Sequence, residues 1–70
     1  MEEKEFKAQF NKKVAVKGTV LIALNDTTLI RADSYKKLFT HKYILYRTGM
    51  AIAWVHLQNV KFVLYDNDEM

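Results

Sequence analysis

The chain has 70 residues, half of them hydrophobic, with no Cys and no Pro. A chain of this length forms one domain at most, and without Cys it lacks the disulfides and thiolate metal sites that commonly stabilise a small core. No stretch is long and apolar enough to cross a membrane, and the first residues are acidic. We therefore expect no membrane span and no signal peptide, and we predict a cytoplasmic protein.

The charges are unevenly distributed along the chain. Between residues 6 and 65 there are ten Lys and Arg but only two acidic residues, Asp26 and Asp33, so this stretch has a net charge of +8, compared with +3 for the whole chain. Such a surface attracts polyanions, because phosphates approach it favourably and release counterions on binding. The alternative is a solvated lysine-rich surface of the kind common in small proteins. The pattern indicates nucleic acid as a class of partner, without giving a mechanism.

The first predicted element is a helix over residues 2–13. Its acidic residues come at the start and its lysines at the end, which suits the partial charges of a helix. Phe6 and Phe10 lie four residues apart and so share one face. Because so short a helix is unstable alone in water, we expect this face to pack on the rest of the domain.

Strands are predicted next. Along residues 14–24 β-branched residues recur in alternation, which is typical of a strand. Gly18 interrupts the alternation and indicates a bulge or a bend. Asn25 and Asp26 form a pair typical of tight turns, and residues 27–32 predict the returning strand.

The polar segment 33–42 has two interpretations. It is either a single helical turn capped by Asp33 or a long loop that carries Lys36 and Lys37.

The last third of the chain predicts three further strands, over residues 43–47, 50–57 and 60–65. Thr48-Gly49 supplies the turn between the first two, and a short kink separates the last two. Alternation along the middle strand places Trp54 and His56 on the same face.

Together these elements predict a mostly β fold, in which a short N-terminal helix precedes a small, strongly bent, five-stranded antiparallel barrel. We expect a single domain over residues 1–70, with the helix in residues 1–13, the barrel in residues 14–65 and an acidic tail in residues 66–70. Asp66, Asp68 and Glu69 are predicted to form this frayed tail.

The order of elements over residues 43–65, with its Thr-Gly turn, a strand ending in Val-His, a kink containing Asn and a short apolar strand, resembles the closing pattern of Sm-like proteins. Residues 55–60, Val-His-Leu-Gln-Asn-Val, resemble the second Sm signature, although Leu57 stands where many members have glycine. Trp54-Val55-His56 is similar to the tyrosine-lysine-histidine triplet of Hfq, the bacterial Sm relative. A helix that ends in basic residues just before the first strand is shared by both groups.

The resemblance implies an Sm-like barrel that assembles into a homo-oligomeric ring of six or seven subunits, with residues 50–57 of one subunit paired with residues 60–65 of the next. Ring closure would remove open strand edges and add core to a small domain. It also implies that the ring binds uridine-rich single-stranded RNA at a central pore, and acts in RNA regulation or as an RNA chaperone. No cofactor is implied.

The resemblance places His56 at the pore rim, where an imidazole can donate to phosphate or ribose. Either Lys42-Tyr43 or His41-Lys42 would occupy the position where the family stacks a ring on a base. The alternatives are a His56 that packs on Trp54 or bonds across strands, and a Tyr43 that belongs to the core.

Lys12, Lys13 and Lys17 form a basic cluster near the helix end, similar in placement to the arginine patch on the outer rim of Hfq. Lysines there would attract RNA without reading its sequence; the alternative is a solvated helix end. Trp54 is predicted to anchor a subunit interface or the core rather than to contact a ligand.

We expect no enzymatic activity, because the sequence has no Cys nucleophile, no glycine-rich phosphate loop and no His-carboxylate cluster at ligand spacing. A second reading, from a different class, is a small SH3-like barrel that binds a protein partner through Tyr43, Tyr46 and Tyr65.

Overall fold

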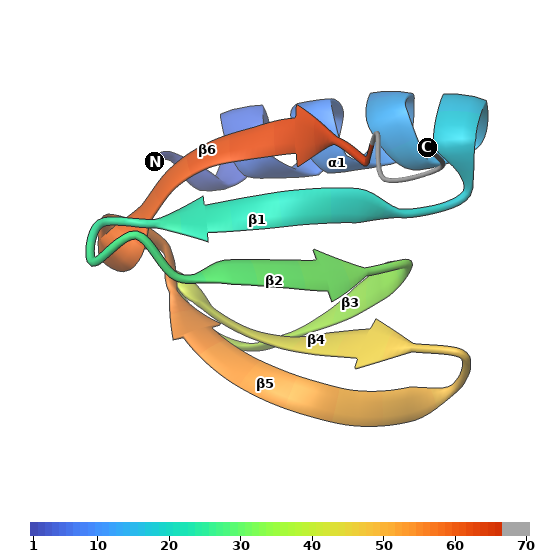
Figure 1. Cartoon of the computed structure of the whole chain (residues 1–70). Helices are drawn as coiled ribbons and strands as arrows, with labels where there is room; N and C mark the ends of the chain where they lie inside the picture. The colour runs from blue at the N-terminus through green and yellow to red at the C-terminus, as the bar shows by residue number, and fades with distance from the viewer. Residues whose placement is uncertain (67–70) are drawn as a thin grey trace.

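The computed structural model describes residues 1–66 and shows one helix followed by six strands and a short 3-10 helix (Figure 1). In chain order these elements are α1 (Glu3–Lys17), β1 (Val20–Leu24), β2 (Leu29–Ala32), β3 (Ser34–Phe39), β4 (Lys42–Arg47), β5 (Met50–His56), η1 (Leu57–Asn59) and β6 (Val60–Tyr65). The start of α1 and the 3-10 helix lie at one end of the molecule, and the turn between β4 and β5 lies at the other (Figure 1).

The strands form two antiparallel three-stranded sheets, with the orders β2-β1-β6 (sheet A) and β3-β4-β5 (sheet B). Asp33 alone separates β2 from β3. Its backbone N–H donates to the Tyr46 carbonyl at 2.9 Å, and its Oδ2 accepts from the Thr48 N–H at 2.8 Å. The chain therefore bends from one sheet into the other at Asp33 while its backbone and side chain stay hydrogen-bonded.

A mostly β fold with an N-terminal helix is confirmed, but the five-stranded closed barrel is not. The structure has six strands in two sheets, and within residues 1–66 β5 and β6 do not pair with each other. The additional strand, β3, comes from the segment 33–42, for which we predicted a helical turn or a loop. Hydrogen bonding to β4 makes it a strand, and its residues are mostly exposed, which is why its sequence shows little alternation.

Helix α1 is longer than predicted. It continues to Lys17 and ends at Gly18, which has a φ of 84° and donates its N–H to the Val14 carbonyl at 2.8 Å. Gly18 is thus a helix C-cap rather than a bulge in a strand, because glycine adopts this left-handed conformation without a steric cost. Val14 packs against the core from the helix, so tertiary contact overrides the strand preference of its local sequence.

The turn and strands of the last third agree with the sequence. Thr48 and Gly49 have φ values of 52° and 82°, as a two-residue hairpin turn requires. The kink between the last two strands is the 3-10 helix η1. Asn25, in the first hairpin, donates its side-chain amide to the Gln58 carbonyl at 3.1 Å, so the two turns are tied together.

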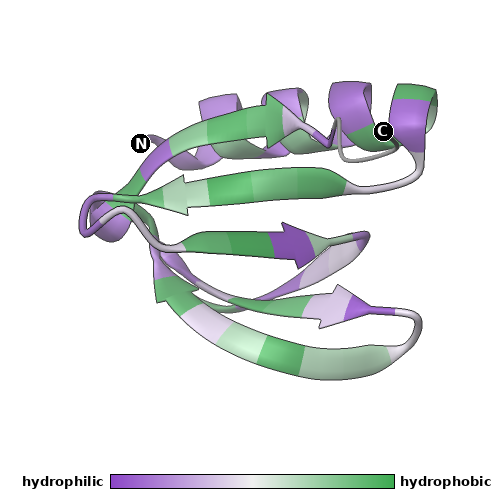
Figure 2. Ribbon diagram, in the orientation of Figure 1, coloured by the Kyte–Doolittle hydropathy of each residue, from purple (hydrophilic) through white to green (hydrophobic). Residues whose placement is uncertain are grey.

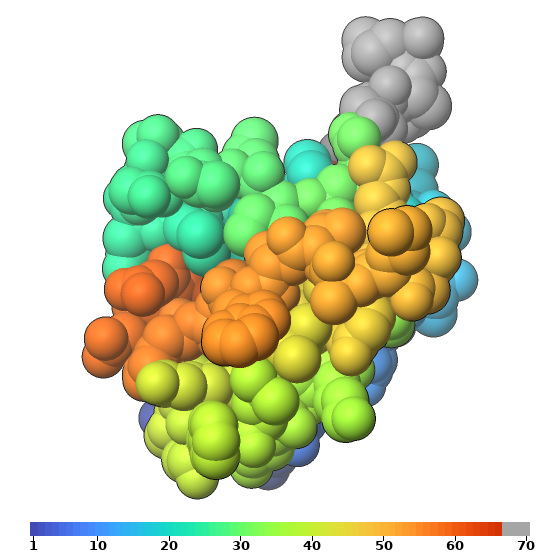
Figure 3. Space-filling model, turned by 90° about the horizontal axis from the view of Figure 1, so that it is seen from below, coloured from blue at the N-terminus to red at the C-terminus, as the bar shows by residue number. Residues whose placement is uncertain are grey.

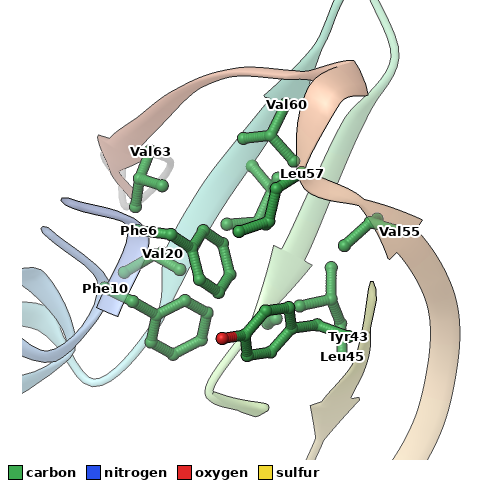
Figure 4. Packing of buried hydrophobic residues seen from close by; sticks show 11 residues of the cluster. Phe6, Phe10, Val20, Tyr43, Leu45, Val55, Leu57, Val60 and Val63 are labelled. Carbon is green, nitrogen blue, oxygen red and sulfur yellow. The ribbon is translucent and has the colours of Figure 1, made fainter. Parts of the chain in front are cut away.

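The core lies between helix α1 and the two sheets, and aromatic rings form its centre (Figure 4). Phe6 and Phe10 point from the helix toward Tyr43 on β4 and are fully or almost fully buried. Phe10 also packs edge-on against Tyr35 of β3, with 4.8 Å between ring centres. The predicted docking of the phenylalanine face is therefore confirmed. Hydrophilic residues make up much of the helix (Figure 2), and most of its charged residues are exposed.

The predicted frayed tail is wrong at its first residue. Asp66 is 7% exposed, accepts from the Thr19 hydroxyl at 2.7 Å and pairs with the Arg31 guanidinium at 2.6 Å. It therefore links the end of β6 to β1 and β2, where a buried carboxylate needs such partners. Asp68 and Glu69 lie outside the described residues.

Across residues 1–66 no helix has the length and apolar character needed to cross a membrane.

Replacing Phe10 with Ala should cost about 3–5 kcal/mol of unfolding free energy, because the ring is lost from a filled core. Val16→Ala is the matched control, since Val16 lies on the same helix but is 66% exposed, and it should change stability by less than about 0.5 kcal/mol. Urea unfolding of both variants measures the difference, and similar losses would contradict the described helix orientation.

Candidate nucleic-acid interface

Sheet B concentrates the positive charge of the chain. Residues 34–56, which form this whole sheet and its turns, contain four basic residues and no Asp or Glu. These residues are Lys36, Lys37, Lys42 and Arg47, and all four are exposed. The sheet is therefore a local region of positive potential, and such a region attracts phosphates.

His56 ends β5 at the point where the 3-10 helix begins. Its Nδ1 accepts the Gln58 N–H at 3.2 Å, which leaves Nε2 as the ring nitrogen available to a ligand. Lys42 lies directly opposite His56 on β4. The His41 ring lies nearly parallel to that of His56, with 6.3 Å between the centres and 11° between the planes. Two histidines and one lysine thus lie at one end of sheet B.

His56 borders two hollows of different chemistry. The first, which we call the Met1 hollow, is lined by Met1, Glu2, Glu5, His41, His56 and Gln58. The second, which we call the Trp54 hollow, is lined by Leu38, Lys42, Tyr43, Trp54, Val55 and His56. Carboxylates lie in the Met1 hollow, and none lines the Trp54 hollow. The Trp54 hollow is therefore the more favourable of the two for an anionic ligand.

Glu3 joins the start of helix α1 to this end of sheet B. Its Oε1 accepts from Lys37 Nζ at 2.8 Å and from the Tyr43 hydroxyl at 3.1 Å, and its Oε2 accepts from the His41 N–H at 2.7 Å. The Lys37 bond, followed by that from His41, lowers the pKa of Glu3 from its ordinary value of 4.5 to about 2. Burial is the main cause that raises the pKa of Tyr43 to about 12, and the hydrogen bond to the Glu3 carboxylate is the next largest.

The structure brings three of the four predicted pore residues together. His41, Lys42 and His56 gather at one end of the fold, and all three are at least partly accessible. Tyr43 is different, because its ring is fully buried among the core aromatics. It cannot offer a face to a base in this structure, and of the two predicted pairs His41-Lys42 is the accessible one.

The predicted rim lysines lie elsewhere. Lys12 and Lys17 are exposed, whereas Lys13 is half-buried, bonded to Gln9 and positioned over the Tyr65 ring at 5.1 Å. Lys17 ends a 15-residue helix whose first turn adjoins His41, so about 20 Å of helix separates it from the histidine pair. The two groups are separate surfaces.

Two residues of this region were not predicted from the sequence as parts of a binding site. Trp54, predicted as an interface or core anchor, is 76% exposed, so it is not a core residue. Glu3 was assigned only a helix-start role, and nothing in the sequence links it to His41. The signal available for the surface was the absence of acidic residues over residues 34–56, together with the predicted shared face of Trp54 and His56.

Comparisons of this chain with models of protein families, with curated proteins and with solved structures found no match. Within residues 1–66, no group of three or more His, Cys, Asp or Glu is placed to hold a metal ion. The site is therefore described by its own chemistry, which is that of two imidazoles, a lysine and an exposed indole.

Glu3→Gln should lower the melting temperature at pH 7 and make stability less sensitive to acid. Because the pKa of Glu3 is lower in the folded chain, its contribution is complete above about pH 4.5 and is lost as the pH falls toward 2. The difference between the wild-type protein and the variant should shrink over that window in thermal melts. Glu5→Gln, in the same helical turn, is the control for charge alone, and an equal effect there would contradict the role given to Glu3.

Proposed function

We propose that this protein is an Sm-like RNA-binding protein that forms a homo-oligomeric ring of six or seven subunits and binds uridine-rich single-stranded RNA at its centre. His56, His41 and Lys42 contact the RNA, and the ring acts in RNA regulation or as an RNA chaperone. The observation that carries the proposal is the meeting of these three residues at one end of a sheet that contains no acidic residue.

The chemistry of this end suits single-stranded RNA. Lysine supplies a point charge for phosphate, and imidazoles donate to phosphate or ribose and offer flat faces to bases. Lys12 and Lys17, on the exposed surface of α1, add attraction that does not depend on sequence, and Lys13 contributes less because its amine is engaged by Gln9 and Tyr65.

The edge strands support self-association. Among the described strands, β5 and β6 each pair on one side only, so both leave backbone donors and acceptors open to another strand. They also carry exposed apolar residues, namely Met50 and Ile52 on β5 and Phe62 and Leu64 on β6. Hydrophobic residues cover most of β5 in Figure 2 although it is an edge strand. Pairing β5 of one subunit with β6 of the next satisfies both edges and closes a ring.

The second reading, an SH3-like adaptor, has less support. It requires Tyr43, Tyr46 and Tyr65 to present aromatic faces to a peptide. None of the three is exposed, and Tyr43 is fully buried.

The proposal predicts an assembly of about 50 kDa for six copies of the 8.2 kDa chain, measured by light scattering at micromolar concentration. Phe62→Glu should convert it to smaller species, because a charge would enter the subunit contact. Leu29→Glu is the matched control, since Leu29 is 57% exposed on β2 at the opposite edge of sheet A, and it should leave the assembly intact. A monomer as the main wild-type species would contradict the ring.

The proposal also predicts that His56→Ala binds a short oligouridine at least about tenfold more weakly, which corresponds to about 1.4 kcal/mol. The melting temperature should fall only slightly, through loss of the exposed bond from the Gln58 N–H. Fluorescence anisotropy of a labelled oligouridine measures the affinity. Arg47→Ala is the control for a basic side chain, since Arg47 lies on the same sheet at the opposite end. Undiminished RNA binding together with a lower melting temperature would instead assign His56 a structural role.

A further inference from the structure

The most exposed large hydrophobic residue of the described chain is its only tryptophan. Trp54 is 76% exposed on β5, while its neighbour Val55 is buried on the opposite side of the strand. The Trp54 side chain therefore lies on the solvent face of sheet B, away from the core aromatics. In Figure 3, β5 runs across the middle of this face beside the segment that forms β3 and the start of β4. An indole exposed to water does not gain the stabilisation that burial would give it, and a large exposed ring often marks a binding surface.

The neighbours of Trp54 indicate what covers it. Across the sheet Trp54 pairs with Ile44, which in turn pairs with Lys36. The next cross-strand pair on the same face is Lys42 with His56. Lys42 and His56 also line the Trp54 hollow, together with Leu38. The indole thus lies next to the apolar Ile44, with Lys36, Lys42 and His56 around it and no acidic residue in the sheet.

We propose that Trp54 is a base-stacking residue, on which an unpaired base of single-stranded RNA lies while Lys42 and Lys36 attract the flanking phosphates. This inference rests on the proposed function and extends it to a residue for which the sequence predicted an interface or core role. Stacking on an aromatic ring is tolerant of sequence, so Trp54 contributes affinity, and His56 beside it supplies hydrogen bonding to the same nucleotide or the next.

The alternative occupant is a second subunit, and electrostatics favours RNA over it. An apolar subunit contact over Trp54 would also remove the Lys42 ammonium and His56 from water, and no acidic group of this face is available to pair with them. A stacked nucleotide covers the indole and brings its own phosphates to the lysines. The exposed apolar residues nearer the other end of β5, Met50 and Ile52, lie away from Lys42 and His56 and suit the subunit contact, although Arg47 lies opposite Met50.

Because Trp54 is the only tryptophan, its fluorescence reports directly on this residue. The free protein should show the red-shifted emission of a water-exposed indole, and addition of a short oligouridine should quench it saturably. Trp54→Leu, which keeps an apolar side chain, should bind the labelled oligouridine at least about tenfold more weakly with unchanged assembly mass, and Trp54→Phe should retain most of the affinity. Leu29→Ala, an exposed apolar position on sheet A, controls for lost surface and should bind normally.

The outcomes separate the two proposals. Wild-type binding by anisotropy with no quenching, and with full affinity in Trp54→Leu, would overturn the stacking role and leave the proposed function standing. Dissociation of the Trp54→Leu assembly, or blue-shifted emission of the free assembled protein, would assign Trp54 to the subunit contact. Either result would also overturn the stacking role. Absence of any wild-type binding to oligouridine would refute the RNA-binding function, and the stacking role with it.

Discussion

The packing of Phe6 and Phe10 against Tyr35 and Tyr43 is the interaction on which the rest of the structure depends. It fixes the helix beside β6 and β1 while its two rings reach the strands of sheet B, so one aromatic cluster joins both sheets to α1. The residues that the structure describes form one core cluster, so a domain of this size has little else to compensate for its loss. The orientation of the helix, and with it the position of its first turn, follows from these rings.

That position determines the character of the candidate site. Once the helix is docked, Glu3 lies within hydrogen-bonding distance of Lys37, Tyr43 and the His41 backbone. The carboxylate holds the turn between β3 and β4 and neutralises one lysine at the edge of the sheet, while Lys36 and Lys42 stay free of it on the solvent face. The helix thereby separates two environments beside His56, an acidic Met1 hollow and a cationic Trp54 hollow.

The bend at Asp33 explains why the number and closure of the strands differ from the prediction. Local sequence at residues 33–42 is polar and shows no clear alternation, because β3 has most of its residues in solvent and only Tyr35 packs on the core. Its strand conformation comes from pairing with β4, a non-local interaction that local pattern does not encode. The same argument applies to residues 14–17, where contact with the core keeps Val14 in a helix. By contrast, the Thr48-Gly49 turn was predictable from its glycine, since the positive φ of Gly49 is a conformation that favours this residue.

The sequence by itself determined the mostly β class, the helix with its buried phenylalanine face, the last three strands and the concentration of positive charge between the acidic ends. These are local or compositional properties, readable from spacing and residue type. Only the tertiary structure decided which residues of that basic stretch lie close together in space. Side-chain burial is a property of neighbours distant in sequence, so the burial of Tyr43 under Phe6, the exposure of Trp54 and the reach of Glu3 to His41 depend on how the helix and two sheets pack.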